Sequence, residues 1–195
     1  MSRSVVPAPD WPQPATISLM LKLFLPPLLA AAALTLSACN PTYNWREVRG
    51  TDVPYTITLP AKPASHTRPV NIDGTKVNMT MTAAEVNDVT FAVGSAELPD
   101  TAKAHAALGA MKTALVKNIG GTIKQEKISG PADAPTEIAI EAVGAPGAGT
   151  GGQPRLLFAR FIAKDKRVYQ VLVVGKEKAV SREAVDTFLT SFKPA

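Results

Sequence analysis

Two apolar runs decide the fold of this chain: Arg155-Leu-Leu-Phe-Ala-Arg-Phe-Ile-Ala163 and Val168-Tyr-Gln-Val-Leu-Val-Val174. Their length and their content of β-branched and aromatic residues predict strands, with apolar side chains on both faces of each strand. Only a tight turn around Asp165-Lys166 separates the runs, so the two strands must pair antiparallel. Because both faces of this pair are apolar, we expect the sheet to be covered on both sides.

Alternation of apolar and polar residues predicts further strands along the chain. The clearest example is Val77, Met79 and Met81, which alternate with polar residues. A turn at residues 85–88 follows and the period of two then resumes, so a hairpin is expected here. The other predicted strands cover residues 55–59, 69–73, 89–93, 122–128 and 137–143.

Capping residues and apolar periodicity predict two helices. The first begins after Asp100, whose carboxylate can accept hydrogen bonds from the free amide groups of the first turn, and ends at Gly120-Gly121. The second covers residues 181–191 and is capped by Ser181. Together with the strands, these helices predict an α+β fold, in which helices pack on both faces of a single antiparallel β-sheet.

Three motifs carry a resemblance to a known family: Tyr55-Thr-Ile-Thr-Leu-Pro60, Arg167-Val-Tyr-Gln-Val-Leu-Val-Val174 and Phe188-Leu-Thr-Ser-Phe192-Lys193. In this order they resemble small bacterial secreted domains of the PsbP-like type, over nearly all of residues 45–193. The resemblance implies a PsbP-like α/β/α sandwich and is silent on chemistry, because these motifs serve core packing. Those domains often carry an arginine after a Pro-Gly pair, but this chain has Pro135-Thr-Glu137 there, so no role of that arginine carries over.

The stretch Leu34-Thr-Leu-Ser-Ala-Cys39-Asn40 contains the only cysteine of the chain and resembles a bacterial lipobox. The resemblance implies cleavage before Cys39 and attachment of a diacylglyceryl group to its thiol. The apolar run before it, residues 23–36, has about 14 residues, whereas a helix that spans a membrane needs ~20. This length is typical of a signal peptide. The alternatives are a spanning helix and an ordinary cleaved signal in which the cysteine is incidental.

This motif divides the chain into a signal peptide at 1–38, a short lipidated tether at 39–44 and a globular domain at 45–195. Residues 1–19 lack the basic character of a signal start, and Met20-Leu-Lys-Leu23 has it, so we expect translation to begin at Met20. Each buried methylene contributes ~0.8 kcal/mol to membrane binding, so two or three acyl chains make desorption negligible.

The residue after the cysteine indicates whether a lipoprotein stays in the inner membrane or moves to the outer membrane. Asn40 is not the aspartate that retains many lipoproteins in the inner membrane, so the resemblance implies the periplasmic face of the outer membrane. The short tether holds the domain close to the lipid. Tyr43 and Trp45 lie just beyond it, and two places are open to them: the membrane interface, or, for Trp45, the core of the domain itself.

The distribution of charged residues argues against nucleic acids as partners. From Cys39 onward the chain has 157 residues, with 19 of the 21 basic and 15 of the 16 acidic side chains, so its net charge is about +4. The basic residues are spread among acids, and no block is longer than Lys164-Asp-Lys-Arg167. Nucleic-acid binding is therefore not expected, and the membrane, through the lipid on Cys39, is the predicted partner.

Several sequence motifs resemble functional sites, but the sequence around each of them argues against such a site. Gly147-Ala-Gly-Thr-Gly-Gly152 matches a dinucleotide-binding pattern, but a strand follows it where that chemistry requires a helix, so a flexible hairpin loop is expected. His66, in a predicted loop, and His105, on the flank of the first helix, are too few for a histidine metal site. Ser95 lacks the rest of a nucleophile elbow. No catalytic, cofactor or metal site is predicted.

Two functional classes remain. The favoured one is a non-enzymatic, lipid-anchored binding or interaction module of the cell envelope, with an envelope protein or a small ligand as its partner. The alternative is a hydrolase-like envelope enzyme whose site is assembled from residues distant in sequence, for example Glu85, Asp88 and Glu97 with His105.

Overall fold

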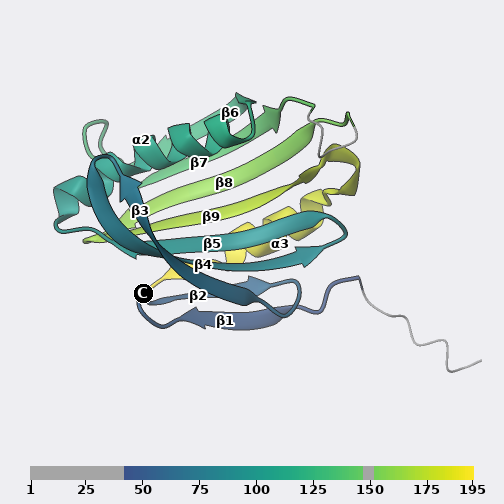
Figure 1. The fold of residues 1–195 in the computed structure, drawn as a ribbon, viewed down its shortest axis with the longest axis horizontal. Coiled ribbons are helices and arrows are strands. Elements are labelled where there is room, and N and C mark those ends of the chain that lie inside the picture. Colours follow the sequence, from purple (N-terminus) through teal and green to yellow (C-terminus); the bar gives the residue numbers. More distant parts are fainter. Residues whose placement is uncertain (1–41, 147–151) are drawn as a thin grey trace, which may run out of the picture. The chain divides into compact units, whose positions relative to one another are not determined.

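The computed structural model describes residues 42–146 and 152–195 of the chain. The strands of these residues are β1 (Arg46–Gly50), β2 (Tyr55–Leu59), β3 (Ala64–Ile72), β4 (Thr75–Val86), β5 (Val89–Glu97), β6 (Gly121–Ser129), β7 (Glu137–Gly144), β8 (Arg155–Lys164), β9 (Arg167–Lys176) and β10 (Lys193–Pro194). They form two sheets (Figure 1). The larger has seven strands in the order β3-β4-β5-β9-β8-β7-β6, and the smaller has three in the order β1-β2-β10. Every pairing in both is antiparallel.

Strands β8 and β9 are the two apolar runs singled out in the sequence, and they lie inside the larger sheet. They pair antiparallel over their whole length, from Arg155 opposite Lys176 to Lys164 opposite Arg167, as predicted. Both faces are buried, because alternate residues of the two strands enter two separate apolar clusters. These strands therefore form the centre of the structure.

Helix α2 (Thr101–Asn118) packs on one face of the seven-stranded sheet, against β6, β7, β8 and β9. Helix α3 (Arg182–Ser191) belongs to the apolar cluster of the opposite face. Both predicted caps are confirmed: the Asp100 carboxylate accepts from the Lys103 amide at 2.8 Å, and the Ser181 hydroxyl accepts from the Ala184 amide at 3.3 Å. Neither helix has the length and apolarity needed to cross a membrane.

The predicted single sheet with helices on both faces is wrong. The three-stranded sheet, together with α3, covers the face opposite α2, so the α/β/α sandwich implied by the PsbP-like resemblance is not the architecture. The alternating sequence of β2 correctly predicts a strand in which Tyr55 and Ile57 are buried. The sequence does not predict the strands that pair with β2. Strand β1 is mostly charged and exposed, and β10 is a two-residue strand after α3, so neither shows a strand pattern.

Aromatic side chains fill the core beneath this second sheet. The rings of Tyr43 and Trp45 each pack edge-to-face on Phe91 with centroids 6.4 Å apart, and Phe91 packs in the same way on Phe188 at 5.4 Å. Trp45 therefore packs against the core of its own domain, which is the second of the two places considered for it. The hydroxyl of buried Tyr169 donates to the Pro54 carbonyl at 2.9 Å and ties β9 to the segment that precedes β2.

The β3–β4 hairpin is longer than the sequence predicted. The expected short piece at 69–73 is the end of a nine-residue strand that pairs with β4 from Ala64 to Ile72. Asp73 and Gly74 form the turn with φ values of 48° and 79°, which suits a two-residue hairpin connection. Strand β3 was hidden because it is an exposed edge strand with few apolar residues. His66 lies within this strand and not in a loop, which corrects its predicted position.

Candidate functional site

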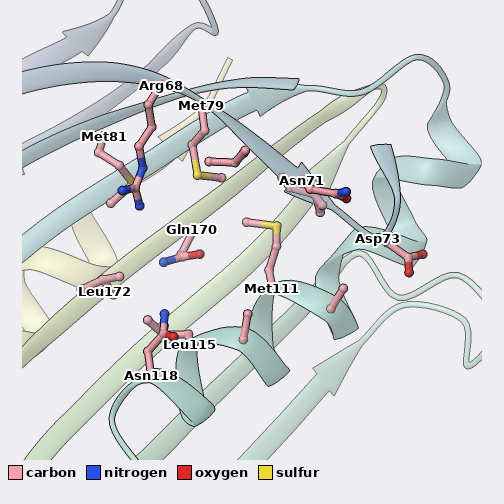
Figure 2. A pocket seen from close by; sticks show the side chains of 14 residues that line it. Arg68, Asn71, Asp73, Met79, Met81, Met111, Leu115, Asn118, Gln170 and Leu172 are labelled. Atoms are coloured by element: carbon pink, nitrogen blue, oxygen red, sulfur yellow. The ribbon is translucent and has the colours of Figure 1, made fainter. Parts of the chain in front are cut away.

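A cavity of about 350 Å³ lies between the β3–β4 hairpin, the carboxyl-terminal half of α2 and strand β9 (Figure 2). Its wall is mainly apolar and includes Met79, Met81, Met111, Leu115 and Leu172. Its polar lining residues are Arg68, Asn71, Asp73, Asn118 and Gln170. An apolar wall with a few polar groups around it is the usual composition of a small-ligand site.

The strand register explains which side chains reach this cavity. On β3 and β4, the hydroxyls of Ser65 and Thr82 lie 2.8 Å apart, and those of Thr67 and Thr80 also lie 2.8 Å apart, so these pairs share one face. The residues between them must face the other way, because side chains alternate along a strand. That opposite face is the one that lines the cavity.

One cross-strand row of the sheet passes beside the cavity. His66 is paired with Met81, Met81 with Gly94, and Gly94 with Gln170. Directly opposite residues of an antiparallel pair share a face, with Cβ atoms ~4.5–5.5 Å apart. His66 therefore lies on the cavity face, beside Met81, although its side chain is exposed at the edge of the sheet.

Gly94 makes room for two methionine sulfurs. A Cβ added at this position would lie 2.6 Å from the Met81 sulfur and 3.4 Å from the Met79 sulfur, so both sulfurs lie directly over the glycine. A glycine inside a strand weakens the strand and often marks a place where another group must approach closely. Here the groups that approach are two thioethers.

The third methionine reaches the cavity from the helix. Met111 is buried on α2, and in Figure 2 its side chain extends from the helix toward Met79. The chain has five methionines, and the other two, Met1 and Met20, lie outside the described residues. All methionines of residues 42–146 and 152–195 therefore line this one cavity.

Arg68 lies at the mouth of the cavity, on the same face as Met79, its partner across the β3–β4 ladder. Its side chain is exposed and extends toward Met81 in Figure 2. The guanidinium joins none of the ion pairs found among the described residues. It therefore places a positive charge at the mouth of the cavity.

The residues named for the enzymatic alternative do not come together. Glu85 and Asp88 lie at one end of the β4–β5 hairpin, where the Asp88 carboxylate pairs with Lys176 at 3.2 Å. Glu97 ends β5 at the other end, roughly 25 Å away at ~3.3 Å per residue. His105 lies on α2, and its Nδ1 donates to the Pro135 carbonyl at 2.8 Å. No shared cleft is formed by these four side chains.

The side chains with a shifted pKa lie away from the cavity. Burial raises the pKa of Tyr55, although a hydrogen bond with Thr82 opposes this, and burial also raises the pKa of Tyr169. The pKa of Arg182 is raised, first by its hydrogen bond to Glu141. None of these three residues lines the cavity. In the described ranges, no group of three or more His, Cys, Asp or Glu side chains is placed to hold a metal ion.

Two features of the sequence lie outside the described residues: Cys39 with its lipobox, and residues 147–151 of the glycine-rich loop. Ser95, which lacked a nucleophile elbow, is buried inside β5. The methionine cavity itself was missed by sequence reasoning. The sequence does place Met79 and Met81 on one face of a strand. The position of Met111 relative to them depends on how α2 packs on the sheet, which the sequence does not show.

Compared with known proteins, the sequence matches no protein-family model and no curated protein.

Proposed function

We propose that this protein is a lipid-anchored binding module of the cell envelope, and that it holds a small ligand in the cavity between the β3–β4 hairpin and α2. The observation that carries the proposal is the cavity itself, because an apolar wall with a few polar groups suits ligand binding. The module is not proposed to catalyse a reaction, because the candidate acid and base residues lie apart.

The lipobox supports the membrane as the place of action. Tyr43 packs on Phe91, and the Asn44 amide donates to the Pro60 carbonyl at 2.8 Å, so the ordered fold begins within a few residues of Cys39. At ~3.3–3.6 Å per extended residue, the chain from Cys39 to Tyr43 spans at most about 14 Å. A lipidated Cys39 would therefore keep the domain close to the periplasmic face of the outer membrane.

The anchor is tested by fractionation of cells that express the full chain or its Cys39→Ala variant. We expect the unaltered protein in the outer-membrane fraction, with the mass of a chain that begins at Cys39 and carries acyl groups. The variant should remain an unprocessed precursor or be released. A variant that still fractionates as a mature membrane protein would refute the anchor.

The binding role is tested by native mass spectrometry of the protein extracted in a mild detergent. We expect a bound ion or molecule on the unaltered protein and its loss in Ala114→Trp, because the indole would fill the cavity that Ala114 lines. The matched control is Ala106→Trp, on an exposed position of the same helix that does not line the cavity. Equal spectra for all three proteins, without any bound mass, would refute the binding role.

A further inference from the structure

The three methionines line the same cavity. They come from two separate elements, β4 and α2, and their thioethers meet at one open cavity of the described structure. A thioether sulfur is a soft, uncharged ligand, and such ligands suit Cu(I) and not hard cations such as Mg²⁺ and Ca²⁺. The chemistry of this wall therefore points to a soft monovalent cation. Few other side-chain types are good ligands of such an ion.

We propose that the cavity is a binding site for Cu(I), with Met79, Met81 and Met111 as thioether ligands and His66 as an imidazole ligand at its edge. This inference rests on the proposed binding function, because it names the ligand of the same cavity. It adds a metal site whose ligands are mainly thioether sulfurs and not carboxylates or thiolates.

Core filling accounts for Met79 and Met111, which belong to the apolar cluster under α2, better than for Met81. Met79 and Met111 are buried, but Met81 is only half-buried and borders open space, where an apolar side chain gains little from burial. Gly94 lies beneath Met79 and Met81 and leaves their sulfurs room that any larger residue would occupy. A strand-internal glycine that weakens β5 is explained if the sulfurs must lie side by side.

The methionine side chains are flexible enough to converge on one ion. Methionine has three rotatable side-chain bonds, so its sulfur adapts to the position of a bound group. The sulfurs of Met79 and Met81 already lie over Gly94, and Met111 extends toward Met79 in Figure 2. His66 is exposed and does not line the cavity, but it is the direct cross-strand partner of Met81 and lies on the same face of the sheet.

Arg68 gives this site a property that can be measured. Its guanidinium lies at the mouth of the cavity and repels a cation bound to the methionines. The charge is exposed, so solvent screens most of the repulsion. Removal of the charge should therefore strengthen Cu(I) binding by a modest factor, about two-fold to five-fold. A site for an anionic ligand would show the opposite effect.

The test is an anaerobic titration of the full chain in detergent with ascorbate-reduced Cu(I), against a chromophoric Cu(I) chelator as competitor. All proteins carry Cys39→Ala, so that the one thiol of the chain cannot bind the metal. We expect one Cu(I) per chain at the site. Loss of groups that only support a metal ligand costs ~10–100-fold in affinity, so each of M79L, M81L and M111L should cost at least about ten-fold.

Matched variants provide a negative control and test the direction of each expected change in Cu(I) affinity. His105→Ala removes an imidazole that does not line the cavity and should leave Cu(I) affinity unchanged, His66→Ala should weaken it, and Arg68→Gln should strengthen it. Leucine is close to methionine in volume, and an unchanged thermal melt of each metal-free variant would show that it folds. Equal Cu(I) affinity for the parent and the triple Met→Leu variant would overturn the metal site. An organic mass lost in Ala114→Trp would then leave the binding function standing.

Discussion

The two faces of the seven-stranded sheet are built from different side chains. The face under α3 and the three-stranded sheet carries nearly all the aromatic rings of the described residues, which pack edge-to-face or tilted in one closed core. The face under α2 carries all three methionines, a single phenylalanine at Phe161, and the open cavity.

This difference separates stability from binding. Aromatic pairs have preferred geometries and bury large areas, so the α3 face resists rearrangement. Methionine side chains are flexible and polarizable, so the α2 face can adapt to a ligand at little cost. Substitutions on the first face are therefore expected to change the free energy of unfolding, and substitutions at the cavity are expected to change binding.

The largest effect is expected from Phe188→Ala. The ring is fully buried and packs edge-to-face on Phe91, and truncation of a buried phenylalanine costs ~3–5 kcal/mol in the free energy of unfolding. Equilibrium denaturation by urea measures the loss. Met111→Leu is the partner experiment on the other face, where a change below about 1.5 kcal/mol is expected. Equal losses for the two variants would remove the distinction between the faces.

Arg160 should have the next largest effect. Its guanidinium pairs with Glu137 at 2.7 Å and donates to the Leu189 carbonyl at 2.6 Å near the end of α3, so it holds that helix onto the sheet. Arg160→Met removes bonds made by a charged donor, which are worth ~1.5–3 kcal/mol. Because the pair is partly exposed, the lower end is expected. Amide hydrogen exchange should rise in α3 and stay unchanged in α2.

Tyr169 gives the aromatic face a dependence on pH. Burial raises the pKa of this phenol, and of Tyr55, above the 10.0 of an exposed tyrosine, so the unfolded chain loses these protons first as the pH rises. The free energy of unfolding should therefore be constant with respect to these groups below pH 10 and fall above it. Tyr169→Phe also breaks the bond to Pro54, which costs ~0.5–1.5 kcal/mol. Denaturation at pH 8 and pH 11 should show a smaller decrease for the variant.

The smallest change in stability is expected from Met81→Leu. The two side chains have similar volumes and Met81 is half-buried, so the free energy of unfolding should change by less than about 1 kcal/mol. The same substitution removes a sulfur from the cavity, so its effect on Cu(I) affinity should be large. A variant that loses much stability and keeps its affinity would reverse the roles assigned to the two faces.

The sequence predicted those parts of the fold that are local. The β8–β9 pair, the turn before β5 and both helix caps follow from apolar patterns and capping residues close together in the chain. The second sheet did not follow, because β1 is charged and β10 pairs with β2 across more than a hundred residues. Strand β3 was only partly predicted for a related reason: an exposed edge strand needs no apolar face.

The candidate site shows the same limit. The alternation of Met79 and Met81 was evident in the sequence, but it served only to assign a strand. The contact with Met111 depends on how α2 packs on the sheet, and the place of His66 depends on the β3–β4 register. These are tertiary properties, so residue spacing alone could not bring the four side chains together.

Silver(I) provides the most direct test that the α2 face is a binding site, because it shares the ligand preference of Cu(I) and stays in one oxidation state. The measurement is an NMR titration of full-length Cys39→Ala protein, labelled with carbon-13 at the methionine methyl groups. We predict that the resonances of Met79, Met81 and Met111 shift together and stop shifting at one equivalent of silver. Resonances of these three residues that do not shift when silver is added would contradict the account.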